Sequence, residues 1–252
     1  MKKTLKGFYL LVSSLFITLL HLPFAFGKPS SVRKLDPKPA VSSSKPTTDS
    51  LQFMAPFKSV YDSLHLDLAG LSKQAFEYAQ KGWHKLVEQG KVINESIIAI
   101  VDFSQPSSHR RLYVLDMKNY KVLFNTLVAH GRNSGKEWAS AFSNRPSSYM
   151  SSPGFYITGE TYLGSNGFSL KLQGIERGIN DLAYKRAIVM HGADYVDESY
   201  IAEQGYIGRS QGCPAVPADE ALPIINTIKN GTCLFIYTPD KRYVSRSGLL
   251  RG

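Results

Sequence analysis

Residues 187–215 read AIVMHGADYVDESYIAEQGYIGRSQGCPA and hold two features that suggest both a fold and a chemistry. The first is an apolar run, Ala187–Met190, that ends in His191 and a glycine. The second is a glycine-rich segment, Gly208–Pro214, that carries Cys213 just before a proline. Apolar residues bounded by glycine favour a strand, and clustered glycines favour a tight turn. We therefore expect a strand whose end presents an imidazole and a turn that presents a thiol.

Short β-rich runs separated by turn residues surround these two features. They alternate with residues such as Gln105-Pro106 and Lys118-Asn119, which favour turns. The runs are Ile97–Phe103, Arg111–Asp116, Lys121–Ala129, Gly154–Gly159, Gly167–Leu172, Arg186–His191 and Thr232–Tyr237. One helix is predicted among them, over Ala218–Lys229. This pattern predicts a mainly β sandwich or barrel with helices at its periphery.

A helical period precedes the strands, over residues 55–92. Apolar residues recur there at steps of three and four, which is typical of an amphipathic helix. They are Leu68, Leu71, Ala75, Phe76, Ala79, Trp83, Leu86 and Val87. Ser72 is a suitable N-cap, and Gly90 is a suitable stop. We expect a helical prefix, then a β domain over residues 93–240 and a C-terminal tail over 241–252.

The first 27 residues resemble a secretory signal peptide. Lys2, Lys3 and Lys6 precede an apolar run, Leu10–Leu20, and Ala25-Phe26-Gly27 supplies small residues for cleavage. The apolar run is short for a membrane span, which disfavours a retained anchor. We expect export to the periplasm or cell envelope, with membrane contact only through an uncleaved leader. Residues 28–54 are rich in proline, serine and threonine, which predicts a flexible tether.

Composition narrows the class of protein without identifying its function. The 252 residues are 43% hydrophobic and 20% charged, enough to build a compact core. Two cysteines are too few for a disulfide scaffold or a four-thiolate zinc site, and the six histidines form no H-x-H or H-E-x-x-H group. The net charge of +10 suits an anionic partner, but no basic helix has the spacing of a nucleic-acid reader.

The thiol and the imidazole suit nucleophilic catalysis. A cysteine on a constrained turn can act as nucleophile when a histidine serves as its base. Gly212 lets the backbone approach a substrate closely, so the amides of Gly212 and Cys213 are candidates for an oxyanion hole.

Two other interpretations of the same residues remain open. Cys213 and Cys233 could form a disulfide, although Cys233 alternates with Phe235 and Tyr237 as a buried strand residue would. Residues 208–212 also fit G-x-S-x-G, the nucleophile elbow of serine hydrolases. That fold needs a histidine after the serine, and none follows His191.

The ordered pattern of these residues resembles the murein L,D-transpeptidase (YkuD-like) catalytic domain over about residues 58–238. The shared feature is a strand-end His-Gly followed by Gly-Arg-Ser-x-Gly-Cys-Pro-Ala. Further matches are Leu71–Phe76, Ile100–Ser104, Val128–Gly135, Phe142–Asn144, Ser151–Tyr156 and Gly178–Asp181.

This resemblance implies a mainly β fold and a cysteine acyl-enzyme, with no cofactor and no metal. Cys213 would be the nucleophile, His191 its base, and the Gly192 carbonyl would orient the imidazole. The thiolate would attack the carbonyl of the diamino acid at position three of a peptidoglycan stem peptide and expel D-alanine. An amine from a neighbouring stem would then form a cross-link. Carbapenem-type inhibitors would acylate the same cysteine.

Further residues are candidates for substrate contacts. They are Arg209, Ser210 and Tyr156, and Arg209 suits a carboxylate. Two departures from the wider family bear on the choice of the acceptor amine. Gln211 stands where histidine is usual, and the separation of 22 residues between His191 and Cys213 is longer than is usual in the family. His130, in a second His-Gly pair, is expected to be a site-wall or structural residue.

Other functions stay open on the sequence alone. One is L,D-carboxypeptidase or endopeptidase activity, in which water replaces the amine. Another is a non-catalytic, peptidoglycan-binding envelope protein with a disulfide. A third is an unrelated cysteine hydrolase that acts on L,L-peptides.

Overall fold

The computed structural model describes residues 59–251. The signal peptide expected at residues 1–27 and the tether expected at 28–54 lie outside this range. Within it, none of the helices has the length and apolar character needed to cross a membrane.

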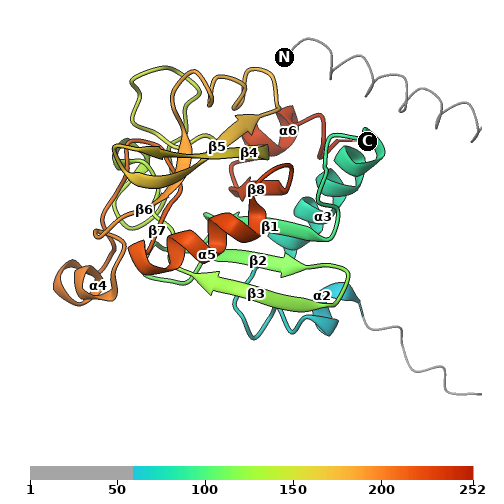
Figure 1. Ribbon diagram of the computed structural model, residues 1–252, viewed down its shortest axis with the longest axis horizontal. Coiled ribbons are helices and arrows are strands. Elements are labelled where there is room, and N and C mark those ends of the chain that lie inside the picture. Colours follow the sequence, from blue (N-terminus) through green and yellow to red (C-terminus); the bar gives the residue numbers. More distant parts are fainter. Residues whose placement is uncertain (1–58, 252) are drawn as a thin grey trace, which may run out of the picture. The chain divides into compact units, whose positions relative to one another are not determined.

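The strands form one eight-stranded mixed sheet in the order β3-β2-β1-β8-β4-β5-β6-β7 (Figure 1). Most neighbouring pairs are antiparallel, whereas β1 pairs with β8 and β6 pairs with β7 in parallel. The bounds are β1 Ile97–Asp102, β2 Leu112–Asp116, β3 Lys121–Thr126, β4 Gly154–Gly164, β5 Gly167–Gly174, β6 Val189–Gly192, β7 Ala215–Val216 and β8 Cys233–Tyr237. The prediction of a mainly β fold is therefore confirmed.

Each of the seven predicted strand runs overlaps an observed strand, but several boundaries differ: β3 ends at Thr126 rather than Ala129, and β4 continues to Gly164 rather than ending at Gly159. β6 begins at Val189 rather than at Arg186, because the residues before it form turns and Ala187 has a positive φ of 54°. Such a backbone conformation cannot continue a strand. The two-residue strand β7 was not predicted, because so short a run leaves no periodic pattern.

Helices lie around the sheet. They are α2 Val60–Ser63, α3 Lys73–Glu88, the 3-10 turn η1 Arg132–Ser134, α4 Glu198–Gln204, α5 Ala218–Ile228 and α6 Lys241–Arg246. The predicted N-cap of α3 is confirmed, since the Ser72 hydroxyl accepts the Ala75 amide at 3.1 Å. The helix ends just before Gly90, whose φ is +64°. The short helices α4 and α6 were not predicted.

The sheet separates two layers of core. On one face α5 packs its isoleucines, Ile224, Ile225 and Ile228, against β1 and β5. On the other face α3 packs against β1 and β8. Gly82 of α3 lies against the Phe155 ring so closely that a Cβ there would be 2.0 Å from it. This contact lets α3 approach the sheet.

The C-terminal segment closes the same face as α3. Tyr243 of α6 is buried, and its hydroxyl donates to the buried Glu176 carboxylate at 3.1 Å. The amide of Phe155 donates to this carboxylate at 2.8 Å, and the Ser247 hydroxyl donates to its other oxygen. Burial raises the pKa of Glu176. The predicted helical prefix and C-terminal tail thus pack into one unit with the strands.

Candidate active site

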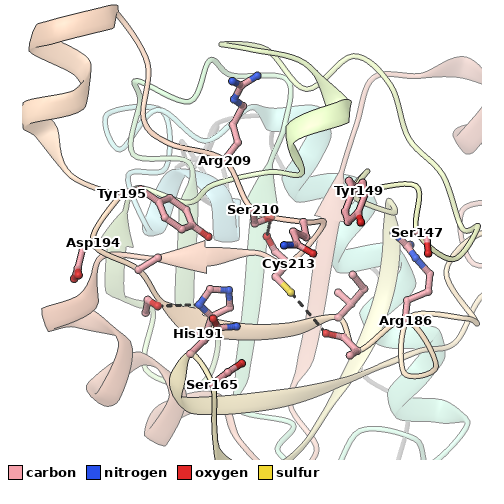
Figure 2. Close-up of a pocket in the computed structure, with 16 residues that line it drawn as sticks. Ser147, Tyr149, Ser165, Arg186, His191, Asp194, Tyr195, Arg209, Ser210 and Cys213 are labelled. Carbon is pink, nitrogen blue, oxygen red and sulfur yellow. Dashed lines mark hydrogen bonds between the residues drawn. The ribbon is translucent and has the colours of Figure 1, made fainter.

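A cavity of about 750 Å³ lies at the end of β6 and beside the turn before β7 (Figure 2). His191 and Cys213 both line it. The other lining residues are Ser147, Tyr149, Ser165, Asn166, Arg186, Ala187, Ile188, Gly192, Ala193, Asp194, Tyr195, Arg209, Ser210 and Gln211. The two groups that the sequence predicted as a catalytic pair therefore meet at one pocket.

Strand pairing explains how residues so far apart in the chain come together. The parallel register of β6 with β7 sets His191 beside Ala215, two residues after Cys213. The structure also places the predicted residues Gly192, Arg209 and Ser210 at this pocket.

The His191 imidazole is held by the backbone of its own strand. Its Nδ1 lies 2.8 Å from the Gly192 carbonyl oxygen, as the resemblance implied. A carbonyl can only accept, so Nδ1 carries the proton and Nε2 keeps its lone pair. Burial lowers the pKa of His191, and the bond to Gly192 raises it in part. The imidazole is therefore neutral near pH 7 and can take up a proton.

Cys213 presents its thiol at the pocket, with two backbone groups beside the sulfur. The Val189 amide lies 3.5 Å from Sγ. Sγ lies 3.7 Å from the Ala187 carbonyl oxygen (Figure 2). Burial raises the pKa of the Cys213 thiol, while the Val189 amide and the Arg186 guanidinium lower it in part. The thiol is protonated at rest, so it needs a base to become a nucleophile.

The turn before Cys213 is closed by its own serine. The Ser210 hydroxyl donates to the Cys213 carbonyl at 2.6 Å and accepts the Gly212 amide at 3.0 Å. Gly212 has a φ of +122°, and a Cβ there would lie 2.8 Å from the Met150 carbonyl oxygen. A side chain at residue 212 is therefore excluded both by its conformation and by space.

These bonds correct one prediction. The Gly212 amide is not a free oxyanion donor, because Ser210 already accepts it. The Ser210 hydroxyl shapes the turn and Ser210 also lines the pocket, so its contact with substrate stays a prediction. The Cys213 amide, like the amides of Arg209 and Gln211, has no acceptor among residues 59–251, so it stays a candidate oxyanion donor.

The prediction that Tyr156 contacts substrate is also corrected. Its side chain is fully buried beneath the sheet with Leu172, and its hydroxyl donates to the Ser152 carbonyl at 2.9 Å. Burial raises its pKa. Alternate residues of a strand point to opposite faces, and Tyr156 points into the core.

Arg209 lies at the rim of the pocket. Its guanidinium donates to the Gly135 carbonyl at 3.2 Å and lies 5.6 Å from the centroid of the Tyr206 ring. Figure 2 shows this side chain directed away from Cys213 and His191. A carboxylate that Arg209 binds would therefore sit at the edge of the pocket rather than at the sulfur.

Arg186 was missed by the sequence analysis. Its guanidinium donates to the carbonyls of Ser143 at 2.9 Å and Met150 at 2.6 Å, and to the hydroxyls of Ser148 and Ser152. It fastens the loop before β4 to the pocket and places a positive charge near Cys213. No local pattern marks such a residue.

Tyr195 is the second residue that the sequence analysis missed. Its side chain packs on Gly208, where a Cβ would come within 2.5 Å, and its carbonyl accepts the Gly208 amide at 2.7 Å. Burial, and to a lesser extent Cys213, raises its pKa to about 12, so the phenol stays protonated. Among residues 59–251 its hydroxyl has no hydrogen-bond partner, and Figure 2 shows it directed toward the centre of the pocket.

Behind the pocket, residues 129–132 hold the cysteine turn. The Ser210 amide donates to the His130 carbonyl at 2.9 Å, and the Arg132 amide donates to the Ser210 carbonyl at 2.8 Å. The His130 Nδ1 accepts from the buried Arg111 guanidinium at 2.8 Å. Its Nε2 lies 3.3 Å from the Gly135 carbonyl, to which it donates. His130 is fully buried and does not line the pocket, in line with a structural role.

A disulfide between the two cysteines is ruled out in this structure. Both thiols are free and buried. Cys233 belongs to β8 and the core layer under α3, whereas Cys213 belongs to the other layer. Across residues 59–251 there is also no group of three His, Cys, Asp or Glu side chains that could hold a metal ion.

With this geometry in place, the comparisons identify the family. The chain belongs to the L,D-transpeptidase catalytic domain family, whose model matches residues 68–237. No curated protein matches the chain.

Solved structures that resemble it include an L,D-transpeptidase from Mycobacterium smegmatis (12% identity, TM-score 0.35, 57% of this chain and 59% of the other). Another is an L,D-transpeptidase in complex with imipenem (14% identity, TM-score 0.35, 56% of this chain and 59% of the other). A third is the helical cell shape determining protein Pgp2 of Campylobacter jejuni (13% identity, TM-score 0.39, 65% of this chain and 56% of the other). The chain thus spans 59% of the length of the first of these, and the family assignment rests on the domain match.

The neutral state of His130 makes stability depend on pH. Burial, and then the Arg111 charge, lowers its pKa from 6.5 to about 3. Between these values the unfolded chain binds one more proton than the folded chain, so the free energy of unfolding rises with pH by about 1.4 kcal/mol per unit from this residue. Above pH 6.5 the contribution is complete. We expect His130→Gln to lower the slope of the unfolding free energy against pH by about 1.4 kcal/mol per pH unit, which corresponds to one proton. Urea unfolding between pH 4 and 6.5 measures this slope. An unchanged slope would contradict it.

Proposed function

We propose that this chain is a peptidoglycan L,D-transpeptidase that forms cross-links through a thioester on Cys213. The observation that carries the proposal is the shared pocket of Cys213 and His191, with the imidazole tautomer set by Gly192. The match of residues 68–237 to the catalytic domain supports the same assignment.

The first half of the reaction needs one proton transfer from thiol to imidazole. Because both groups are neutral at rest, Nε2 of His191 takes the proton as the sulfur attacks the carbonyl of the diamino acid at stem position three. The Cys213 amide and the Tyr195 hydroxyl are the candidate donors that would stabilise the oxyanion. His191 then returns the proton to the leaving amine, D-alanine departs, and a thioester remains.

The second half uses the same groups in reverse order. The amine of a neighbouring stem attacks the thioester carbonyl, and His191 accepts its proton. The C–S bond breaks, the thiol is restored, and an amide links the two stems. If water attacked instead, the product would be a shortened stem, as in a carboxypeptidase. The free thiols favour these reactions over a binding protein built on a disulfide.

We also propose that residues 1–27 direct the chain to the periplasm or cell envelope, where its substrate is found. Their composition supports this, with three lysines before an apolar run. Fractionation of cells that express the full chain would locate the protein, and recovery only in the cytoplasm would refute the proposal.

The two cysteines should separate function from stability. We expect Cys213→Ala to abolish product formation from a disaccharide-tetrapeptide, since no other thiol lines the pocket. Cys233→Ala should keep the activity and lower the free energy of unfolding by about 1–3 kcal/mol, because it opens a small space in the core. Mass spectrometry of the products and urea unfolding measure the two effects. Equal and complete loss of activity in both folded variants would overturn the assignment of Cys213.

The pH dependence should reflect a neutral pair. The acid limb of kcat/KM should follow the lowered pKa of His191, below 6.5, and the alkaline limb should follow the raised pKa of the thiol, above 9. We therefore expect a plateau that includes pH 7 to 8. A resting thiolate–imidazolium pair would instead give an alkaline limb within that interval, so a decline there would refute the neutral pair.

A carbapenem should acylate the same sulfur. One solved relative was determined in complex with imipenem, which supports testing that class of compound here. We expect the intact mass of the protein to rise by the mass of one carbapenem, and Cys213→Ala to prevent the increase. An unmodified mass in protein that is active on stem peptides would contradict this prediction.

A further inference from the structure

The hairpin of β4 and β5 forms one wall of the pocket. The two strands end at the paired glycines Gly164 and Gly167, and the two residues between them, Ser165 and Asn166, line the cavity (Figure 2). A ligand that extends out of the pocket over this wall must therefore cross the outer part of the hairpin.

The strand register places Tyr162 in line with His191. Tyr162 pairs with Ser169 across β4 and β5, and Ser169 pairs with His191 across β5 and β6. Directly opposite residues of an antiparallel pair share a face of the sheet. Tyr162 therefore stands on the same face as the base, two strand spacings or about 10 Å away.

The Tyr162 ring is seated against the sheet with part of its surface free. It lies over Gly164, where a Cβ would come within 2.6 Å of the ring, and the side chain is 37% exposed. The Lys171 ammonium lies 5.7 Å from its centroid and pairs with Glu160 at 2.6 Å. We call Tyr162 and Lys171 the hairpin platform.

The chemistry of this platform suits a sugar. Exposed tyrosine rings offer an apolar face and a hydroxyl, which match the C–H face and the hydroxyl groups of a pyranose. A purely apolar partner would have to cover the Lys171–Glu160 ion pair. An anion would meet a lysine whose charge Glu160 already offsets.

The distance also fits the donor substrate of the proposed function. Three residues separate the sugar from the carbonyl that Cys213 would attack, and three extended residues span about 10 Å. This is about the separation of Tyr162 from His191 given by the register. A stem bound with its reactive carbonyl at the sulfur can thus bring its sugar to the hairpin platform.

We propose that the hairpin platform binds the sugar that carries the donor stem peptide. The proposal rests on the proposed function for the identity of that substrate. It assigns Tyr162 as the main contact and gives the enzyme a preference for stems that remain attached to the glycan.

Binding to an inactive chain tests the platform directly. In Cys213→Ala protein we expect a disaccharide-tetrapeptide to bind about tenfold more tightly than the free tetrapeptide in calorimetric titrations, the scale of one aromatic contact. Adding Tyr162→Ala should remove this difference, and Tyr162→Trp should preserve it. Tyr120→Ala is the matched control, since Tyr120 is 53% exposed in the turn between β2 and β3 at the far edge of the sheet. It should leave the difference unchanged.

Two results would overturn the proposal: equal affinities for the two ligands in the Cys213→Ala protein, or the same ratio with Tyr162→Ala as with Tyr120→Ala. Product formation from the disaccharide-tetrapeptide by the unaltered chain is measured separately. Its absence would remove the proposed function, whereas a sugar-dependent affinity that Tyr162→Ala abolishes would still support the platform.

Discussion

The site depends above all on the backbone pairing between residues 129–132 and the turn that carries Cys213. This pairing holds the turn at both ends, through the His130 carbonyl and the Ala215 carbonyl. It is itself supported by a fully buried guanidinium, Arg111, which donates to Val128, Gln105 and His130. Burying such a group is costly unless its donors are satisfied. The pocket is therefore supported from behind by a polar network that no substrate reaches.

Burial acts in opposite senses on the pKa values of the two groups of the proposed catalytic pair. It raises the pKa of the Cys213 thiol and lowers the pKa of the His191 imidazole, so both disfavour charge until a substrate arrives. In the proposed mechanism, the Cys213 amide and the Tyr195 hydroxyl are the donors that would meet a developing negative charge. Preorganised donors need no reorganisation as that charge forms. The arrangement favours formation of charge during the reaction rather than before it.

Local patterns were sufficient for seven of the eight strands of the sheet, for α3 and α5, and for the pocket shared by His191 and Cys213, but not for β7, α4 or α6. Glycine-bounded β-rich runs marked the strands, and a strand-end histidine with a turn cysteine marked the pocket. The errors concern orientation. Tyr156 is buried because both faces of β4 are covered by core there, with Phe155 in one layer and Tyr156 in the other. The fate of the Gly212 amide depends on where the Ser210 hydroxyl turns. Arg186 and Tyr195 reach the pocket only through tertiary packing, against Met150 and Gly208 respectively. None of these relations leaves a signal in neighbouring residues.

The central position of β8 has a consequence for how the chain folds. This strand, residues 233–237, comes last in sequence yet lies between β1 and β4. Without it the sheet consists of two separate halves, β1 to β3 and β4 to β7, each with an unpaired inner edge. A growing chain cannot complete this sheet before residues 233–237 have been made, and closure then joins segments more than a hundred residues apart. Such non-local pairing slows folding. Until it is complete, two open strand edges are exposed to aggregation.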